Sequence, residues 1–557
     1  MPSERGNMSD GSDGYSKLDD VPETPASGTR ASRPERVIRN GTDLERIVDE
    51  YIQAFAAFGR FPVFQRAGAL VDVVQSATTE QDRGRVASAE GIARIRALPL
   101  PRIHELLTMV AQFERNTEGG SFVKASPPKN IAPTLMARGY WSGIPVLYGI
   151  SRWPILRVDG SLCTKPGYDL RTGLLYEPSC TVRVLESPSK DDARQAIESL
   201  LDLLVDFPFV EKRVHDTAWI ATLLSIVGRA AIDGPVPLLL IDASDKGSGK
   251  TLLADLLAVI VLGKPAPRRT KPESPEEWKK AMLSLALAAL PLVLLDNVTG
   301  TLQSDALDAV LTGTEFQERL LGANEECTQR FHSVFAVTAN NALISEDLVR
   351  RSLQVRIETG VERPEQRTNF RHPDLLRYAL AHRAELLSAA LTVLRAYFVA
   401  GCPKVAMRPM GSYEEWSRVV RGALIWAGQP DVAVTQDDLR DCANEERTDA
   451  STLLHAWYAY LGEAPTTLAD VLEDLSRFEV GQHPQKEALR QALCTVCPAP
   501  EGKLPTSRKL AYRIRALTGK VMPGGFVLRR GKHGDRGVPW HVELVSPKNA
   551  GRGESSS

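Results

Sequence analysis

The chain has 557 residues, of which 43% are hydrophobic, so it is long and apolar enough for roughly three or four domains with packed cores. Its 68 basic residues are balanced by 69 acidic ones, which excludes a protein that binds nucleic acid through a strongly positive overall charge. Any contact with an acidic polymer must therefore come from a local basic patch.

The cysteine pattern and the apolar runs bear on the compartment. Seven cysteines are scattered, and one close pair, Cys494 and Cys497, has no second pair at zinc-ribbon spacing. We expect free thiols in a reducing compartment, with this pair in a core rather than on a metal. The start of the chain lacks the apolar core of a secretion signal, and the longest apolar run, 281–295, is too short for a bilayer and contains Pro291. These features predict a cytoplasmic protein with no membrane partner.

The first two hundred residues give a fold class but no role. Residues 1–40 are rich in Ser, Gly, Asp and Pro with almost no large apolar side chains, so we expect a disordered tail there and another at 546–557. Residues 41–207 mix helical periodicity with short strands and turns, which predicts an α+β domain of unknown role. Asp159 and Asp169 fall beside glycine-containing turns, and we interpret them as turn residues rather than catalytic acids.

Residues 208–365 alternate helices with short apolar runs at 237–242, 291–297 and 332–341. Near-continuous apolar strands separated by helices predict a parallel sheet covered on both faces, which is α/β architecture. A helical segment follows at 366–430, and we expect it to form a lid.

The first apolar run leads into SDKGSGKT, residues 244–251. In the pattern GxxxxGK followed by Ser or Thr, backbone amides wrap a phosphate, the lysine adds positive charge and the hydroxyl ligates Mg²⁺. The predicted site consists of Ser244, Gly247, Ser248, Gly249, Lys250 and Thr251. Ser244 stands where the pattern has its first glycine, which matters only if that residue requires a positive φ.

The next two apolar runs end in polar residues. Asp296 is placed where a carboxylate would hold the Mg²⁺ of a nucleotide, although a strand-ending turn Asp is the alternative. Many ring ATPases have a glutamate at the following position, whereas Asn297 has an amide that orients water but cannot accept its proton. We therefore expect slow hydrolysis or a carboxylate supplied from elsewhere. Thr338, Asn340 and Asn341 end the third run, and we expect their side chains beside the γ-phosphate.

Arg350 and Arg351 follow the third run between apolar residues. A pair of arginines alone is typical of a solvated face or of salt-bridge partners. An arginine that reaches the γ-phosphate of a neighbouring subunit would instead stabilise the charge of the transition state. The order of phosphate loop, acid, polar strand end and arginines favours this second interpretation.

These residues together carry a family resemblance. The run 235–358, with GSGKTLLA, LTGTEFQERLLGANEE, VTANN and DLVRRSLQVRI, resembles the ATPase core of superfamily 3 and AAA+ type helicases. It is most similar to the helicase half of phage and mobile-element primase-helicase proteins, and the likeness extends to about residue 428. The resemblance implies a P-loop NTPase (AAA+-like) core that uses ATP and Mg²⁺ and acts as a ring, expected to be a homo-hexamer.

The resemblance also implies residue roles. Lys250 and Thr251 would hold the phosphate and Mg²⁺, and Asp296 would be the magnesium acid. The sensor would be Asn340 or Asn341, and Arg351, or after it Arg350, would act across a subunit boundary. Ser244 and Asn297 depart from the pattern, and both departures bear on rate rather than on nucleotide binding.

A hairpin is expected over residues 317–331, around Gly322. In the family that the chain resembles, a hairpin here projects into the central channel, so Arg319 and Arg330 are candidates for contact with single-stranded DNA. The alternative is a surface hairpin that packs on its own subunit.

The end of the chain, 431–545, contains a concentrated basic run. Ten basic residues and one acid lie between Lys503 and Arg536, which indicates a local anion-binding face. The expected helix 507–519 places Leu510, Ile514 and Leu517 on its apolar side, and a two-stranded wing follows. The candidate DNA contacts are Arg508, Lys509, Tyr512, Arg515, Arg529, Arg530, Lys532 and Arg536. Helix and wing predict a winged-helix-like domain that binds duplex DNA, and a protein-interaction domain is the alternative.

The sequence as a whole predicts an ATP-dependent DNA helicase or replication initiation protein of a phage or mobile element. One alternative is a non-unwinding ATPase switch or loader that assembles on DNA or on a host replication partner. Another is a sequence-specific DNA-binding protein with a vestigial ATPase. Residues 41–200 show no paired-carboxylate strand, so we do not predict primer synthesis by this chain. A separate primase and a host replication protein are candidate partners.

Overall fold

The computed structural model describes residues 36–41, 43–58, 63–75, 93–244, 247–319, 326–341, 343–360, 364–477, 483–499, 503–515, 517–532, 534 and 537–545. Nearly all of the predicted tail at 1–40 and the whole of 546–557 fall outside these residues. The chain divides into two compact units, Met1–Gln436 and Asp437–Ser557. None of the helices in the described part combines the length and hydropathy that a membrane span requires.

The first unit begins with three helices and two small sheets. The helices are α1 (Leu44–Ala57), α2 (Leu100–Val110) and α3 (Ile131–Ala137). The strands are β1 (Val37–Arg39), β2 (Phe64–Arg66), β3 (Ala69–Gln75), β4 (Ala93–Ala97), β5 (Gln112–Asn116) and β6 (Phe122–Lys124), in the orders β1-β5-β6 and β2-β3-β4. The apolar sides of the helices meet in one core that includes Ile47, Leu107 and Trp141, all fully buried.

Short hairpins follow the helices. Their strands are β7 (Gly149–Ser151), β8 (Ile155–Leu156), β9 (Leu162–Cys163), β10 (Gly167–Asp169) and β11 (Leu174–Tyr176). In the β8–β9 turn, Asp159 accepts a hydrogen bond from the Ser161 amide at 3.0 Å. Asp169 is buried and its carboxylate pairs with Arg157 at 2.8 Å. Both acids therefore have structural partners in the turns.

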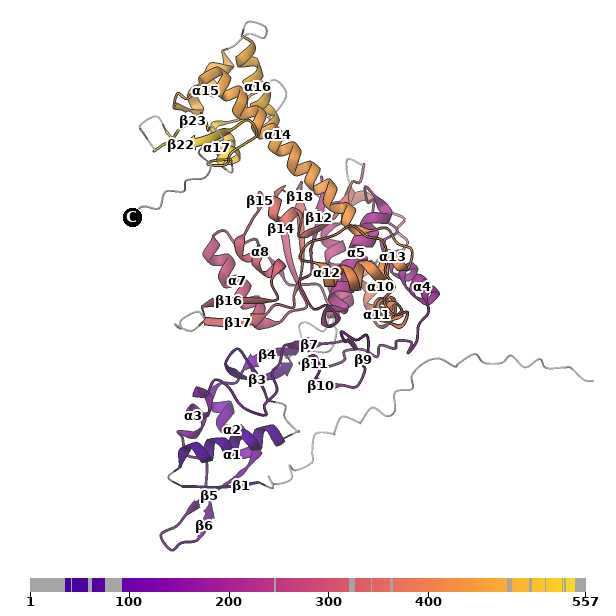
Figure 1. The fold of residues 1–557 in the computed structure, drawn as a ribbon, viewed down its shortest axis with the longest axis vertical. Coiled ribbons are helices and arrows are strands. Elements are labelled where there is room, and N and C mark those ends of the chain that lie inside the picture. The colour runs from indigo at the N-terminus through magenta and orange to yellow at the C-terminus, as the bar shows by residue number, and fades with distance from the viewer. Residues whose placement is uncertain are drawn as a thin grey trace, which may run out of the picture. The chain divides into compact units, whose positions relative to one another are not determined.

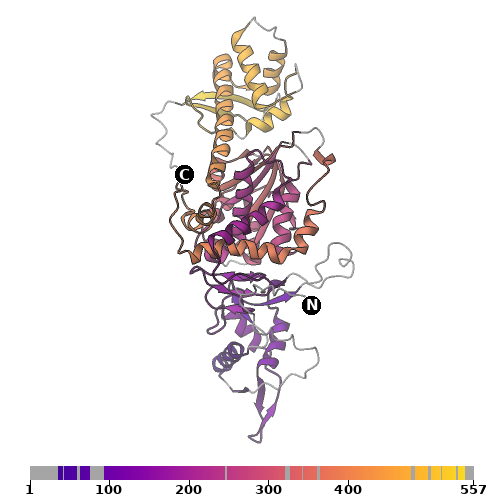
Figure 2. The same ribbon diagram turned by 90° about the vertical axis from the view of Figure 1, so that its right-hand side faces the viewer.

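The centre of the unit is a five-stranded parallel sheet in the order β13-β14-β18-β12-β20. Its strands are β12 (Leu238–Ala243), β13 (Arg268–Arg269), β14 (Leu292–Val298), β18 (Val334–Asn340) and β20 (Ser352–Ile357). The chain is thus a mixed α/β protein with a parallel sheet. Figures 1 and 2 show helices on both sides of it, as the near-continuous burial of β12 and β18 requires.

Helices and short strands connect the strands of this sheet. They are α4 (Lys190–Leu201) and α5 (Lys212–Val227) before β12, then α6 (Lys250–Leu262), α7 (Pro275–Ala288), β15 (Thr301–Leu302), α8 (Asp305–Thr312), β16 (Glu315–Arg319), β17 (Glu326–Arg330), β19 (Leu343–Ile344) and α9 (Glu346–Val349). β16 and β17 form an antiparallel hairpin, as predicted for 317–331. The residues between them, 320–325, lie outside the described part.

The helices after β20 pack into the same core as the sheet. They are α10 (Leu375–Ala381), α11 (Arg383–Val399), α12 (Glu414–Trp416), the π-helical turn Ser417–Arg421 and α13 (Gly422–Trp426). One hydrophobic cluster contains Trp153, Leu204, Leu239 and Trp416, so a single core spans the expected boundaries at 207 and 365. The division between the two units falls at Gln436, inside α14 (Thr435–Leu461). The lid role of α10 to α13 stays a prediction.

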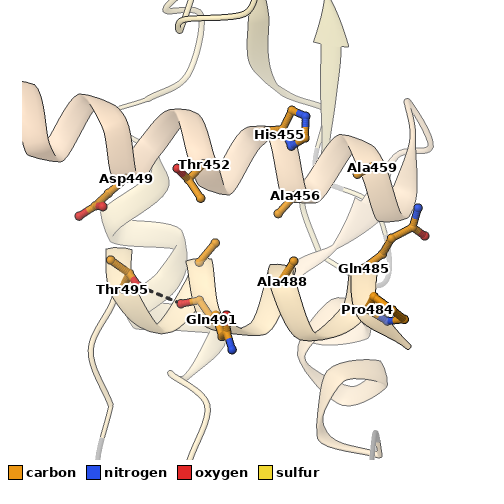
Figure 3. Close-up of a pocket in the computed structure, with 11 residues that line it drawn as sticks. Asp449, Thr452, His455, Ala456, Ala459, Pro484, Gln485, Ala488, Gln491 and Thr495 are labelled. Atoms are coloured by element: carbon orange, nitrogen blue, oxygen red, sulfur yellow. Dashed lines mark hydrogen bonds between the residues drawn. The ribbon is translucent and has the colours of Figure 1, made fainter. Parts of the chain in front are cut away.

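The second unit is a small α+β domain. After α14 it contains β21 (Thr466–Thr467), α15 (Leu468–Ser476), α16 (Pro484–Val496), α17 (Ser507–Arg515), β22 (Phe526–Arg530) and β23 (Pro539–Leu544), with the sheet order β21-β23-β22. Trp457, Leu489, Leu510 and Val542 are fully buried in its core. A groove of about 460 Å³ lies between α14 and α16, where small side chains such as Ala456 and Ala488 face each other (Figure 3).

Candidate nucleotide site and basic surface

The glycine-rich turn joins the carboxyl end of β12 to the start of α6. Gly247 and Gly249 have φ values of 78° and 97°, in the left-handed region where glycine has no steric cost. A side chain on Gly249 would also come within 3.3 Å of the Phe207 ring. Ser244 is not among the residues with positive φ in the described chain, so its place does not require glycine. Asp245 and Lys246 lie outside the described residues.

The predicted phosphate and metal ligands meet at this turn. Lys250 is the first residue of α6 and is buried, with its Nζ 3.0 Å from the Ser248 hydroxyl. Thr251 follows it, close enough to Asp296 for its hydroxyl to help lower the pKa of that carboxylate. Because β14 and β12 are parallel, their carboxyl ends lie at one edge of the sheet, with β18 between them. The structure therefore brings together three residues that the sequence places up to 46 positions apart.

Asp296 is held by hydrogen bonds on both carboxylate oxygens. Its Oδ1 accepts from the Thr338 hydroxyl at 2.6 Å, and its Oδ2 accepts from Arg268 at 2.7 Å. Burial alone would raise the pKa of Asp296, but the hydrogen bonds from Thr338, Arg268 and Thr251 outweigh it and lower the pKa. The carboxylate is therefore ionised at neutral pH, as a ligand for a hard cation must be.

Thr338 also fixes the residue that departs from the family pattern. Its hydroxyl accepts the Asn297 amide at 2.8 Å, where the β14–β18 register shifts between Leu295 and Val298. Asn297 has a φ of 53°, a left-handed conformation that asparagine tolerates better than most residues. Its side-chain oxygen is 3.5 Å from the Asn340 amide nitrogen, a weak contact. Asn341 follows with a φ of 48° and donates its amide to the Ala243 carbonyl.

Arg268 and Asp255 complete the site and were missed in the sequence. Arg268, on the edge strand β13, bridges Asp296 at 2.7 Å and Asp255 on α6 at 2.9 Å. Asp255 is 5% exposed, and burial raises its pKa while Arg268 lowers it. A single acid in the apolar helix LLADLLAVIVL was the available signal, because a buried carboxylate requires a partner. Nothing in the sequence around Arg268 pointed to it as that partner.

The two candidate finger arginines have different surroundings. The Arg351 side chain is 13% exposed and pairs with Asp308 of α8 at 2.5 Å. The Arg350 side chain is 62% exposed and its nearest acid is Asp347, three residues earlier on α9. Arg351 is thus held inside its own chain, whereas Arg350 points toward solvent.

The two hairpin arginines lie at opposite ends of the β16–β17 ladder. Arg319 is paired in register with Glu326, next to the undescribed tip, and Arg330 is paired with Glu315 at the base. Four residues of strand separate the two positions, about 13 Å. The Arg330 guanidinium lies 4.9 Å from the ring centre of Tyr148, in the first part of the same unit. The structure does not bring these two candidate DNA contacts together.

The basic face of the second unit is carried by α17 and β22. Leu510 and Ile514 are buried against the core, and Tyr512 on the opposite side is 72% exposed. Arg508, Lys509, Arg515, Arg529, Arg530 and Lys532 are all exposed, and Arg536 lies outside the described residues. Arg529 is partly neutralised by Glu543 on β23 at 2.8 Å. Of the predicted DNA contacts that the structure describes, none lines the groove between α14 and α16.

The predicted core cysteines lie in the second unit. Cys497 is buried in its hydrophobic cluster, and Cys494 is half-buried. In the described part of the chain, no group of three or more His, Cys, Asp or Glu side chains is arranged to hold a metal ion.

Comparisons with known proteins give only distant likenesses. No protein-family model matches the chain, and no curated protein matches it. Among solved structures, the NrS-1 C-terminal region is 13% identical, covers 79% of this chain and 98% of its own, and gives a TM-score of 0.31. The JCV helicase is 17% identical over 42% of this chain and 59% of its own, with a TM-score of 0.21. The active helicase Cch of SCCmec type IV is 12% identical over 87% and 98%, with a TM-score of 0.28. Likenesses this remote do not transfer an activity to this chain.

Proposed function

We propose that the chain is an ATP-dependent DNA helicase or replication initiation protein of a phage or mobile element, with Lys250, Thr251 and Asp296 at its nucleotide site. The observation that carries the proposal is an ionised Asp296, held by Thr338 and Arg268 at the edge of the sheet where a glycine turn leads into Lys250 and Thr251. A hydroxyl and a carboxylate are the oxygen ligands that Mg²⁺ prefers. The N-terminus of α6 adds backbone amides that can donate to a phosphate.

Each side chain at the nucleotide site would have a separate role. Lys250 neutralises phosphate charge, and Thr251 and Asp296 hold the metal side of the nucleotide. Thr338 keeps the Asp296 carboxylate oriented and Asn297 in place, because it bonds to both. The chemistry that Mg²⁺ would supply in this place is neutralisation of the phosphate charge during transfer. Asn297 and Asn340 lie at the same edge and supply amides that orient an attacking water.

A ring would supply the remaining charge from the next subunit. The family resemblance pointed first to Arg351, but its ion pair with Asp308 favours Arg350 as the residue that reaches a neighbour's γ-phosphate. Arg351 then fixes the start of β20 to α8. We expect a homo-hexamer with single-stranded DNA in its channel near Arg319, a cytoplasmic location, and a separate primase or host replication protein as a partner.

The second unit would bind duplex DNA. The order of its elements, with β23 between β21 and β22 in the sheet, supports a winged-helix-like domain with α17 as the basic helix. The exposed Arg508, Tyr512 and Arg515 form one side of α17. Phosphate contacts of this kind weaken strongly as salt rises.

Displacement of a labelled strand from a forked duplex tests the proposal. Wild type and Lys264→Ala, which removes an exposed lysine beyond α6, should separate strands with Mg-ATP, and Lys250→Ala should not. Strand separation by Lys250→Ala at the wild-type rate would refute the proposal.

The second candidate function is a non-unwinding ATPase switch, and Asn297 favours it. If wild type binds ATP but neither turns it over appreciably nor separates strands, the switch replaces the helicase. Asn297→Asp restores a carboxylate in a residue type that also tolerates the left-handed φ of 53°. Under the switch hypothesis this substitution should raise ATP turnover, measured as phosphate release. Asn369→Asp, at an exposed asparagine that also has a positive φ of 64°, should not.

A further inference from the structure

Besides the groove in the second unit, the structure has a cavity in the unit Met1–Gln436 whose wall is rich in arginine. It measures about 460 Å³. Its walls come from the β8–β9 and β10–β11 turns, from the segment after α5, and from the residues that flank the β16–β17 hairpin. Four guanidinium side chains line it: Arg157, Arg171, Arg229 and Arg330. Three stretches of chain that are distant in sequence therefore place positive charge on one cavity.

This cavity lies at the other edge of the parallel sheet from the nucleotide site. Residues 232–234 precede β12 and His332 precedes β18, so both are at the amino ends of their strands. Lys250 and Asn297 follow the carboxyl ends. A strand of six residues separates the two edges by about 20 Å. The cavity is therefore a separate site.

Two of the four arginines are already paired with carboxylates. Arg157 contacts Asp169 at 2.8 Å, and Arg171 contacts Asp159 at 2.6 Å. The first pair is mostly buried and the second is about half exposed. These pairs fix the positions of the guanidinium groups and reduce, without abolishing, the positive charge on this side of the cavity.

The other two arginines have no carboxylate within hydrogen-bond distance in the described part of the chain. Arg229 donates to the carbonyl oxygens of Ile232 at 2.8 Å and Phe331 at 3.2 Å, and its buried Nε has no partner there. Arg330 lies over the Tyr148 ring at 4.9 Å. Asp233 also lines the cavity. Burial lowers the pKa of Arg229, the negative charge of Asp233 raises it, and the positive charge of Arg330 lowers it further. A net positive charge remains on the wall.

His332 adds a neutral polar group to the same wall. Its Nε2 is buried and has no hydrogen-bond partner in the described part of the chain. Burial, followed by the charges of Arg229, Arg66 and Arg330, lowers the pKa of His332 to about 3. The imidazole is therefore neutral at physiological pH, and a ring N–H is able to donate to a ligand.

The geometry points to a phosphate-binding pocket in which Arg229, Arg330 and His332 donate to one phosphate group, with Arg171 at the open side. A guanidinium matches the oxygens of a phosphate in a bidentate way, and donors from three directions suit its tetrahedral shape. The phosphate belongs either to a free anion or to the backbone of a nucleic-acid strand, because both present the same chemistry. The pocket does not depend on the nucleotide site at the opposite edge.

The test uses the full chain carrying Lys250→Ala, so that the nucleotide site does not contribute. Inorganic phosphate and an oligothymidylate without terminal phosphate are each titrated by calorimetry. Arg330→Glu and Arg171→Glu should each weaken binding of at least one probe about tenfold or more, because each removes a charge-assisted hydrogen bond and adds a negative charge beside the phosphate. Arg94→Glu, on the exposed side of β4, makes the same charge change elsewhere and should leave the affinity within about twofold.

The outcomes separate the sources of the phosphate. If inorganic phosphate binds and both pocket variants lose that binding, the pocket is a free-anion site. If only the oligonucleotide binds and both pocket variants lose that binding, the pocket takes the backbone of a strand. If Arg330→Glu loses binding but Arg171→Glu does not, the phosphate contacts the hairpin alone and the proposed pocket is wrong. Absence of binding by both probes, or equal affinity of the pocket variants and Arg94→Glu, overturns it as well. Failure of the nucleotide site appears instead as unchanged ATP turnover in Lys250→Ala.

Discussion

The nucleotide site and the basic face of the second unit are built in opposite ways. The nucleotide site joins Thr251 of helix α6 with Arg268, Asp296 and Thr338, which lie on three different strands of the sheet. The basic face comes from one continuous run between Arg508 and Lys532. The first site therefore depends on the fold of the whole sheet, while the second depends on one helix, one strand and their local core.

This difference predicts how each site responds to substitution. Side chains in the nucleotide site share partners, so removal of one leaves another group buried without its bond. Side chains on the basic face are exposed and act nearly independently on a charged ligand. Changes in the first site should be large and coupled, and changes in the second small and additive.

The largest expected effect separates the two adjacent arginines. Arg350→Ala should lower ATP turnover of the assembled protein by about 10³-fold or more, as loss of an arginine finger does, with no change in Tm because the side chain is exposed. Arg351→Ala should lower Tm instead, because it leaves Asp308 half-buried and unpaired. Turnover at increasing protein concentration and thermal unfolding measure the two effects. The reverse assignment of effects would return the finger role to Arg351.

An intermediate effect is expected at Arg268. Arg268→Ala should raise the Mg²⁺ concentration needed for half-maximal turnover by about tenfold to 100-fold, as removal of a group that orients a metal ligand does. Arg268→Lys should raise this Mg²⁺ concentration less than Arg268→Ala does, because the lysine keeps the positive charge beside Asp296. The adjacent and exposed Arg269 is the matched control, and Arg269→Ala should behave as wild type. An unchanged magnesium requirement with only a lower Tm would limit Arg268 to a structural role.

The smallest effect is expected on the basic face. Arg508→Ala and Arg515→Ala should each weaken duplex binding about threefold to tenfold and lower the slope of log K against log salt by about one. The loss of binding free energy in the double variant should equal the sum of the losses in the two single variants. Fluorescence anisotropy over a salt series measures both quantities. Equal binding by the double variant and wild type would remove α17 from the DNA interface.

Sequence patterns predicted the parallel sheet and the glycine turn because both depend on local features. Continuous apolar runs gave the three strands, and the glycine turn at Gly247 and Gly249 has the positive φ values that its composition requires. The amphipathic pattern of α17 correctly placed Leu510 and Ile514 in the core.

The remaining features are long-range contacts that no local pattern encodes. Arg268 lies on a two-residue strand and meets Asp296 because β13 and β14 are neighbours in the sheet. Arg351 pairs with Asp308 across 43 positions. Arg330 lies over the Tyr148 ring and lines the arginine-rich cavity because the first part of the unit packs at the base of the hairpin. Its contact with DNA stays a prediction.

The most direct test of the nucleotide site is Mg²⁺-dependent ATP hydrolysis by wild type, Asp296→Asn, Lys250→Ala and Lys264→Ala, measured side by side with single-stranded DNA present. We predict turnover in wild type and Lys264→Ala. Asp296→Asn and Lys250→Ala should each lower turnover about 10²-fold to 10³-fold, because each removes a charge at the phosphate or its metal. Equal turnover by all four proteins would contradict this prediction and leave Lys250 and Asp296 with a structural role only.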